Sequence, residues 1–154
     1  MLPHAPIDEA ILRNTPGLEL LQMMIDGKLP RPPINETLGF HLAKIERGRA
    51  EFHAVPEHRH FNPIGSIHGG FAATILDSAM ACAIHSLLDA GQTYTTIEFK
   101  ITFIRGMTPE TGPIRCIGEV INVGRRLGVS QGEIIDANGK VLAHGTTSCM
   151  IFTP

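Results

Sequence analysis

One long stretch of this sequence is almost free of charge, and it constrains the fold more than any other feature. Between Asn62 and Gln92 the only formally charged side chains are Asp77 and Asp89, and the stretch contains neither Lys nor Arg. A helix that is apolar nearly all round is typically buried. Because Asp77 and small polar residues interrupt the apolar run, and no Lys or Arg flanks it, a membrane span is not expected. The sequence therefore predicts one buried central helix.

Segments after this helix alternate apolar and polar residues with the period of half-buried strands. The expected strands are residues 96–103, 114–123, 127–135 and 141–152. In the first strand, Ile97, Phe99, Ile101 and Phe103 are expected on one face, with Thr96 and the intervening polar residues on the other. The fold class predicted is α+β, with a long central helix wrapped by an antiparallel sheet of five to six strands.

The N-terminal part of the chain differs in character from the rest. Two short helices are expected at residues 8–14 and 17–26, and the run Leu29-Pro30-Arg31-Pro32-Pro33 disfavours helix and sheet pairing alike. We therefore divide the chain into a helical extension with a Pro-rich connector, residues 1–33, and a main domain, residues 34–154. The main domain is expected to begin with a hairpin of strands at 38–45 and 49–55.

Composition excludes several classes of function. Thirteen basic residues against fifteen acidic ones give a net charge of −2, so no nucleic-acid partner is expected. The N-terminus shows no signal-peptide pattern, and three widely spaced cysteines fit reduced thiols, which together predict a cytoplasmic protein. The spacing of His58 and His60 matches no zinc-ligand pattern, so no metal site is expected.

Asp77 and the start of the central helix are the features that suggest chemistry. A buried, unpaired carboxylate is costly, so Asp77 is either hydrogen-bonded as part of the structure, neutral, or used in a reaction. Gly69 and Gly70 open the helix, where the first N–H groups have no partner inside the helix and could hold an oxygen that gains negative charge. A tight Gly-rich turn and a structural Asp remain the plain alternatives.

The spacing of these two features predicts how they could cooperate. Asp77 lies eight residues after Gly69, which is roughly 12 Å along a helix that rises about 1.5 Å per residue. One helix therefore cannot bring its own carboxylate to a substrate atom at its own N-terminus. If the two cooperate, Asp77 must come from a second copy, and a two-fold dimer with antiparallel helices is the simplest arrangement.

Several motifs together resemble the hot-dog-fold acyl-CoA thioesterases, and the nearest branch is the phenylacetate-pathway (PaaI-type) group. They are Asn62-Pro-Ile-Gly-Ser-Ile-His68-Gly69-Gly70, Leu76-Asp77-Ser78-Ala79, Tyr94-Thr95-Thr96-Ile97-Glu98-Phe99-Lys100 and Phe103-Ile104-Arg105. The resemblance runs from about residue 34 to 152. It implies a hot-dog fold, hydrolysis of an acyl-CoA thioester, and a homodimer with shared active sites that pairs into a dimer of dimers. Coenzyme A would be part of the substrate, with no separate cofactor.

The resemblance also implies a role for each matching residue. The backbone N–H of Gly69 would polarise the thioester carbonyl, and Asp77 of the partner subunit would act as general base on water or as nucleophile. Asn62 would help place the water or the thioester, and His68 would lie near the leaving sulfur. Thr96 would occupy the hydroxyl position that orients the carboxylate or water.

Weaker expectations concern the parts of the substrate away from the thioester. Arg125 and Arg126, at a Gly-led turn, resemble a phosphate-binding turn for coenzyme A, and Arg105 is a weaker candidate; solvated surface charges are the alternative. Phe61, Ile64 and the N-terminal helices are expected in the wall of the acyl pocket. Two other functions remain open: hydration or dehydration of an acyl thioester, and acyl-CoA binding without cleavage.

Overall fold

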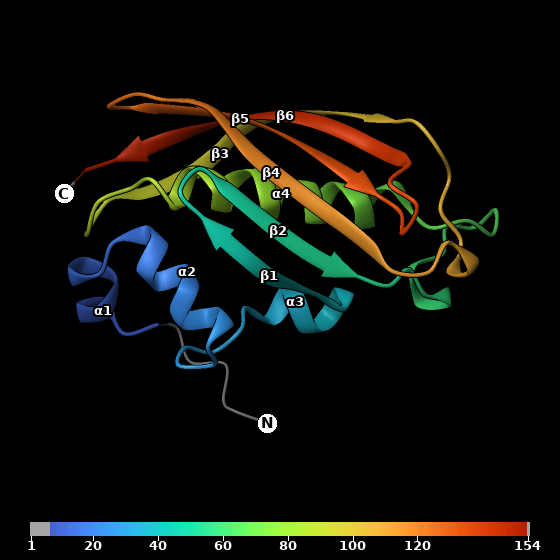
Figure 1. Cartoon of the computed structure of the whole chain (residues 1–154), viewed down its shortest axis with the longest axis horizontal. Coiled ribbons are helices and arrows are strands. Elements are labelled where there is room, and N and C mark those ends of the chain that lie inside the picture. Colours follow the sequence, from blue (N-terminus) through green and yellow to red (C-terminus); the bar gives the residue numbers. More distant parts are fainter. Residues whose placement is uncertain (1–6, 154) are drawn as a thin grey trace.

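The structure, a computed structural model, describes residues 7–153. Six antiparallel strands form one sheet in the order β1-β2-β4-β5-β6-β3, which curves over helix α4 (Figure 1). This arrangement confirms the predicted α+β class with a wrapped central helix. The elements are α1 (Glu9–Asn14), α2 (Gly17–Ile25), α3 (Pro33–Leu38), β1 (Phe40–Glu46), β2 (Arg49–Ala54), η1 (His58–His60), α4 (Gly69–His85), β3 (Thr93–Phe103), η2 (Pro109–Thr111), β4 (Ile114–Val123), β5 (Leu127–Ile135) and β6 (Val141–Phe152).

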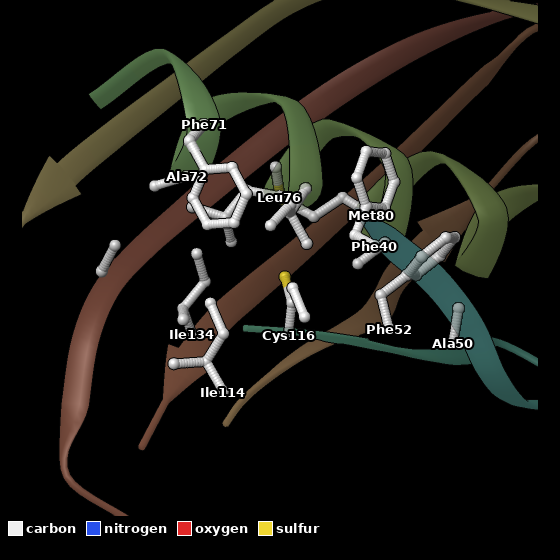
Figure 2. Packing of buried hydrophobic residues seen from close by; sticks show 14 of the residues in the cluster. Phe40, Ala50, Phe52, Phe71, Ala72, Leu76, Met80, Ile114, Cys116 and Ile134 are labelled. Atoms are coloured by element: carbon white, nitrogen blue, oxygen red, sulfur yellow. The ribbon is translucent and has the colours of Figure 1, made fainter. Parts of the chain in front are cut away.

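The core lies between α4 and the sheet. Phe71, Leu76 and Met80 point from the helix toward Cys116 and Ile134 of the strands (Figure 2). Burial of these apolar side chains is the main favourable contribution to folding. At 17 residues α4 is the longest helix, and in the described part of the chain no helix is long and apolar enough to cross a bilayer.

A row of glycines brings the sheet close to α4. Gly118, Gly132 and Gly145 are neighbours in register on β4, β5 and β6. A Cβ at Gly118 would clash with the carbonyl oxygen of Ala79, and one at Gly132 would lie 2.9 Å from Cγ of Met80. The helix can therefore pack directly on the strand backbones only because Gly118 and Gly132 have no side chain, whereas a Cβ at Gly145 would lie 2.9 Å from the carbonyl oxygen of Lys100 in β3.

The connector between α2 and β1 contains a helix that the sequence did not predict. Pro33 is the first residue of α3, although the Pro-rich run was expected to exclude helix. A proline is tolerated there because the N–H that it lacks would have no partner inside the helix. Gly39, with φ 66°, ends α3 in the left-handed conformation, so β1 begins at Phe40 and not at residue 38.

A bulge in β3 corrects the prediction that Thr96 and Phe99 lie on opposite faces of the strand. Thr96 pairs with Cys149 of β6 and Glu98 pairs with Ser148, which leaves Ile97 as an extra residue. Because the bulge shifts the alternation by one residue, Thr96 shares the helix-facing side of the strand with Phe99. A period-2 pattern cannot reveal such a shift, since it assumes an uninterrupted strand.

Candidate active site

Asp77 projects from the middle of α4 toward β3. Its Oδ1 accepts a hydrogen bond of 2.9 Å from Oγ1 of Thr96, and Oγ1 also lies 3.7 Å from Sγ of Cys149. Its Oδ2 has no hydrogen-bond partner among the described residues. One oxygen thus fixes the orientation of the half-buried carboxylate, and the other is free to act on a ligand.

A cavity of about 250 Å³ opens beside Asp77 and Thr96. The N-terminal part of the chain forms one wall, through Leu21 and Met24 of α2, Arg31 of the connector, and residues of α3. Phe61 and Ile64, which were expected in a pocket wall, do not line this cavity. The residues around it are Leu21, Met24, Arg31, Pro32, Ile34, Asn35, Leu42, Phe52, Asp77, Ser78, Ala81, Cys82, Tyr94 and Thr96.

The titratable neighbours of Asp77 are held in their neutral forms. Burial raises the pKa of the Cys82 thiol to about 12 and raises the pKa of Tyr94 well above its usual range. The His85 ring lies 5.1 Å from the Tyr94 ring, centroid to centroid, and burial lowers its pKa to about 4. A thiol with so high a pKa is a poor nucleophile. Asp77 is therefore the candidate for a base or nucleophile in this group of residues.

The start of α4 carries a second group of predicted residues. Nδ1 of His68 accepts a hydrogen bond of 2.8 Å from the N–H of Gly70, which assigns the ring proton of neutral His68 to Nε2. The N–H of Gly69 has no hydrogen-bond partner within residues 7–153. The helix start thus offers a backbone donor at the positive end of the helix dipole.

Asn62 shapes the loop that leads into this helix. Its Oδ1 accepts from the N–H groups of Ile64 and Ser66, both at 3.1 Å, and its Nδ2 donates to Oγ of Ser66 at 2.8 Å. These bonds make Asn62 a local structural residue in this chain. A direct contact with substrate stays a prediction.

The structure brings the predicted residues together as two separate groups. Thr96 joins Asp77, whereas Asn62 and His68 join Gly69 at the helix start. Gly69 also lies beside the end of β3, because a Cβ there would be 3.0 Å from Cζ of Phe103. These two groups, the candidate half-sites, lie near the two ends of the segment 96–103 of β3.

The three predicted phosphate-binding arginines are also split. Arg125 and Arg126 are exposed in the β4–β5 turn, next to a hollow that Gln92, Phe152 and Thr153 also line. Arg105 follows the far end of β3, and this strand of 11 residues is roughly 36 Å long at about 3.3 Å per residue. None of the three forms an ion pair with a residue that the structure describes.

No metal centre is evident in the described part of the chain. Among residues 7–153, no group of three or more His, Cys, Asp and Glu side chains is placed to hold a metal ion. The ring of His60 is buried and stacks on Phe71, with 4.1 Å between the centroids.

Comparison with known proteins adds independent information. Residues 64–143 match the thioesterase superfamily. A Halobacterium salinarum protein named as an esterase is 29% identical over 96 residues, and the match spans 57% of this chain but only 62% of that protein. The 1,4-dihydroxy-2-naphthoyl-CoA hydrolase of Listeria monocytogenes is 20% identical over 109 residues, which cover 71% of this chain and 87% of that protein.

The fold has a close match among solved structures. The E. coli PaaI protein from the phenylacetic acid degradation operon superposes with a TM-score of 0.76. The two are 20% identical, and the match covers 88% of this chain and 95% of that one. This likeness confirms the predicted hot-dog fold.

Proposed function

The chain belongs to the thioesterase superfamily, and from this premise we propose that it hydrolyses an acyl-CoA thioester to the free acid and coenzyme A. The observation that carries the proposal is the carboxylate of Asp77, which Thr96 holds by one oxygen at the wall of a largely apolar cavity. The carbonyl of a thioester is already activated and its thiolate leaves readily. One carboxylate and a few preorganised hydrogen-bond donors are therefore sufficient to catalyse its hydrolysis.

The edge of β3 supports a dimer as the working unit. β3 ends the strand order, so one of its edges has no partner strand within residues 7–153. Ile97 and Phe103 on this strand are 50% and 57% exposed. A long unpaired edge with apolar side chains is a template for pairing with another strand. We infer that two copies pair through β3 in an antiparallel manner.

Such pairing would unite the two half-sites. In two antiparallel β3 strands whose two-fold axis passes through residue 100, the bulge at Ile97 sets Thr96 of one protomer opposite Phe103 of its partner. Asp77 is bonded to Thr96, and Gly69 lies beside Phe103. The carboxylate of one protomer would thus approach the helix start of the other. The same pairing would bring Arg105 of one protomer toward Arg125 and Arg126 of its partner, where the phosphates of coenzyme A could bind.

In the proposed reaction the N–H of Gly69 donates to the thioester oxygen as negative charge develops on it. Asp77 of the partner uses Oδ2 either to take a proton from the attacking water or to attack the carbonyl carbon itself. Collapse of the tetrahedral intermediate breaks the C–S bond, and the Nε2–H of His68 would stabilise the departing thiolate. If Asp77 attacked directly, the acyl group is left as a mixed anhydride on Asp77, and water then hydrolyses this anhydride to release the acid and restore the carboxylate. The reaction consumes one water and needs no cofactor, and we place it in the cytoplasm.

Replacement of Asp77 by Asn tests this proposal. The variant should stay folded and dimeric, while release of free thiol from acyl-CoA substrates falls by about a thousandfold or more. Wild-type turnover in the variant would contradict the assignment. If the wild-type protein consumes acyl-CoA without releasing thiol, it is a hydratase or dehydratase. If the wild-type protein binds acyl-CoA tightly but consumes none, across aryl, short and long acyl groups, it is a binding module.

A further inference from the structure

Asn35 is a buried polar residue that the folding of the chain does not explain. Only 8% of its surface is exposed, and it lines the cavity beside Asp77. Its backbone N–H donates to the carbonyl of Pro32 and its carbonyl accepts from the N–H of Gly39, but its side-chain amide has no hydrogen bond to any described residue. The amide is not fully enclosed, because it lies on the cavity wall, where its donors and acceptor are open to a ligand.

Asn35 shares the cavity with two charged side chains. The charged side chains that line this cavity are Arg31 and Asp77. Arg31 forms no ion pair with a residue in the described range, and it lies on the connector immediately before α3. Two unused hydrogen-bond donors therefore share the wall made by the N-terminal part of the chain, while the carboxylate of Asp77 comes from α4.

The other residues that line the cavity, together with its volume, indicate what kind of ligand fits. Leu21, Met24, Leu42 and Phe52 are among the apolar residues that line the rest of the cavity. Its volume of about 250 Å³ corresponds to roughly eight water molecules at about 30 Å³ each. A short chain or a single ring with a polar far end fits this space.

We propose that Asn35, assisted by Arg31, selects acyl groups whose far end carries an oxygen atom that accepts hydrogen bonds. The inference rests on the proposed function, because it takes Asp77 to mark the thioester end of the cavity. The Asn35 amide donates its N–H groups to the terminal oxygen, and Arg31 adds attraction where that oxygen belongs to a carboxylate. A carboxylate and a hydroxyl group share this chemistry.

Three acyl-CoA substrates with the same six-carbon skeleton distinguish the possibilities: hexanoyl-CoA, 6-hydroxyhexanoyl-CoA and adipoyl-CoA. The wild type should show a higher kcat/KM for at least one of the two oxygenated substrates than for hexanoyl-CoA. A single hydrogen bond gives a preference of about fivefold, and a bond to a charged group gives tenfold or more. The Arg31→Gln variant should reduce the preference for adipoyl-CoA alone, which identifies the carboxylate as the favoured end group.

Asn35→Asp is the decisive variant because it keeps the size of the side chain but removes both donors and adds negative charge. It should lower the ratio of kcat/KM for adipoyl-CoA to that for hexanoyl-CoA by at least tenfold. Asn138→Asp is the matched control in the exposed turn before β6, and it should leave both values unchanged. A ratio that changes less than threefold in Asn35→Asp overturns the inference.

A binding measurement separates failure of this inference from failure of the proposed function. If the wild type hydrolyses neither these three substrates nor the panel of aryl, short and long acyl-CoA molecules, the proposed function fails. Thioether analogues of the same three acyl-CoA molecules, which cannot be hydrolysed, then report selection alone by calorimetry. A tenfold fall in the relative affinity of Asn35→Asp for the adipoyl analogue supports the inference, and a change below threefold overturns it.

Discussion

The hydroxyl of Thr96 is bonded to the carboxylate of Asp77 in the same chain, at 2.9 Å, and the bulge at Ile97 places it there. Replacing Thr96 by Val removes this bond while it keeps the shape of the side chain. Since a hydrogen bond to a charged group contributes about 1.5–3 kcal/mol, we expect kcat to fall by tenfold or more. Thr96→Ser keeps the hydroxyl and should retain most of the activity. Equal kcat values for the Val and Ser variants would contradict an orienting role.

Gly69 permits a test of a single backbone N–H. Gly69 is the first residue of α4, a position that accepts proline, and His68 has the extended conformation that a residue before proline requires. Gly69→Pro should therefore keep the helix but remove the donor, and lower kcat by about a hundredfold to a thousandfold.

Gly69→Ala is the matched control, because it brings the same Cβ toward Phe103 but retains the N–H. Its thermal unfolding and its kcat should stay close to the wild type. If the alanine and proline variants lose activity equally, the contact with Phe103 and not the lost donor is responsible.

Mixed dimers test whether the two half-sites come from different chains. In a dimer of one Asp77→Asn chain and one Gly69→Pro chain, shared sites leave one site fully intact and place both defects in the other. Turnover per purified mixed dimer should therefore return to about half of the wild-type value, measured as thiol release. Sites formed within single chains would leave both sites defective, and the mixed dimer would then be as inactive as its parents.

His85 predicts how stability depends on pH. Burial lowers its pKa to about 4 in the folded protein, against about 6.5 in an unfolded chain. Above about pH 6.5 neither state binds this proton, so the contribution of neutral His85 is fully present. Between pH 6.5 and 4 only the unfolded state binds it, so the free energy of unfolding should fall with decreasing pH by up to about 1.4 kcal/mol per unit.

Urea denaturation at pH 7, 6 and 5, at one protein concentration, measures this slope. His85→Gln removes the titrating group, and the difference in slope between wild type and variant isolates its contribution from that of other histidines. Identical slopes in the two proteins would show that His85 does not cause the pH dependence.

The parts of this structure that follow from local patterns were predictable. The absence of charge around Asp77 predicted the central helix, and alternation predicted the strands and the α+β class. The spacing of Gly69 and Asp77 predicted that the two residues lie apart on one helix, because helix geometry is nearly invariant, and α4 contains both. That a second copy completes the site stays a prediction.

Features that depend on three-dimensional packing were not predictable. The bulge at Ile97 depends on pairing with β6, so the alternation placed Thr96 on the wrong face. The prolines around helix α3 led to the prediction of an irregular connector. A proline as the first helical residue, Pro33, and a glycine after the last one, Gly39, are nevertheless typical of a helix and could have predicted it. Asn35 is an ordinary polar residue in the sequence, and only the cavity beside Asp77 shows that its amide lacks a partner.

The glycine row under α4 has a consequence for catalysis as well as for packing. The distance from helix to sheet determines how far Asp77 stands from β3, and Gly118 and Gly132 keep that distance short. A methyl group at Gly118 would lift the helix and stretch the bond between Asp77 and Thr96, although it touches neither residue. The absence of side chains at these positions of the sheet thus determines how close the Asp77 carboxylate lies to Thr96.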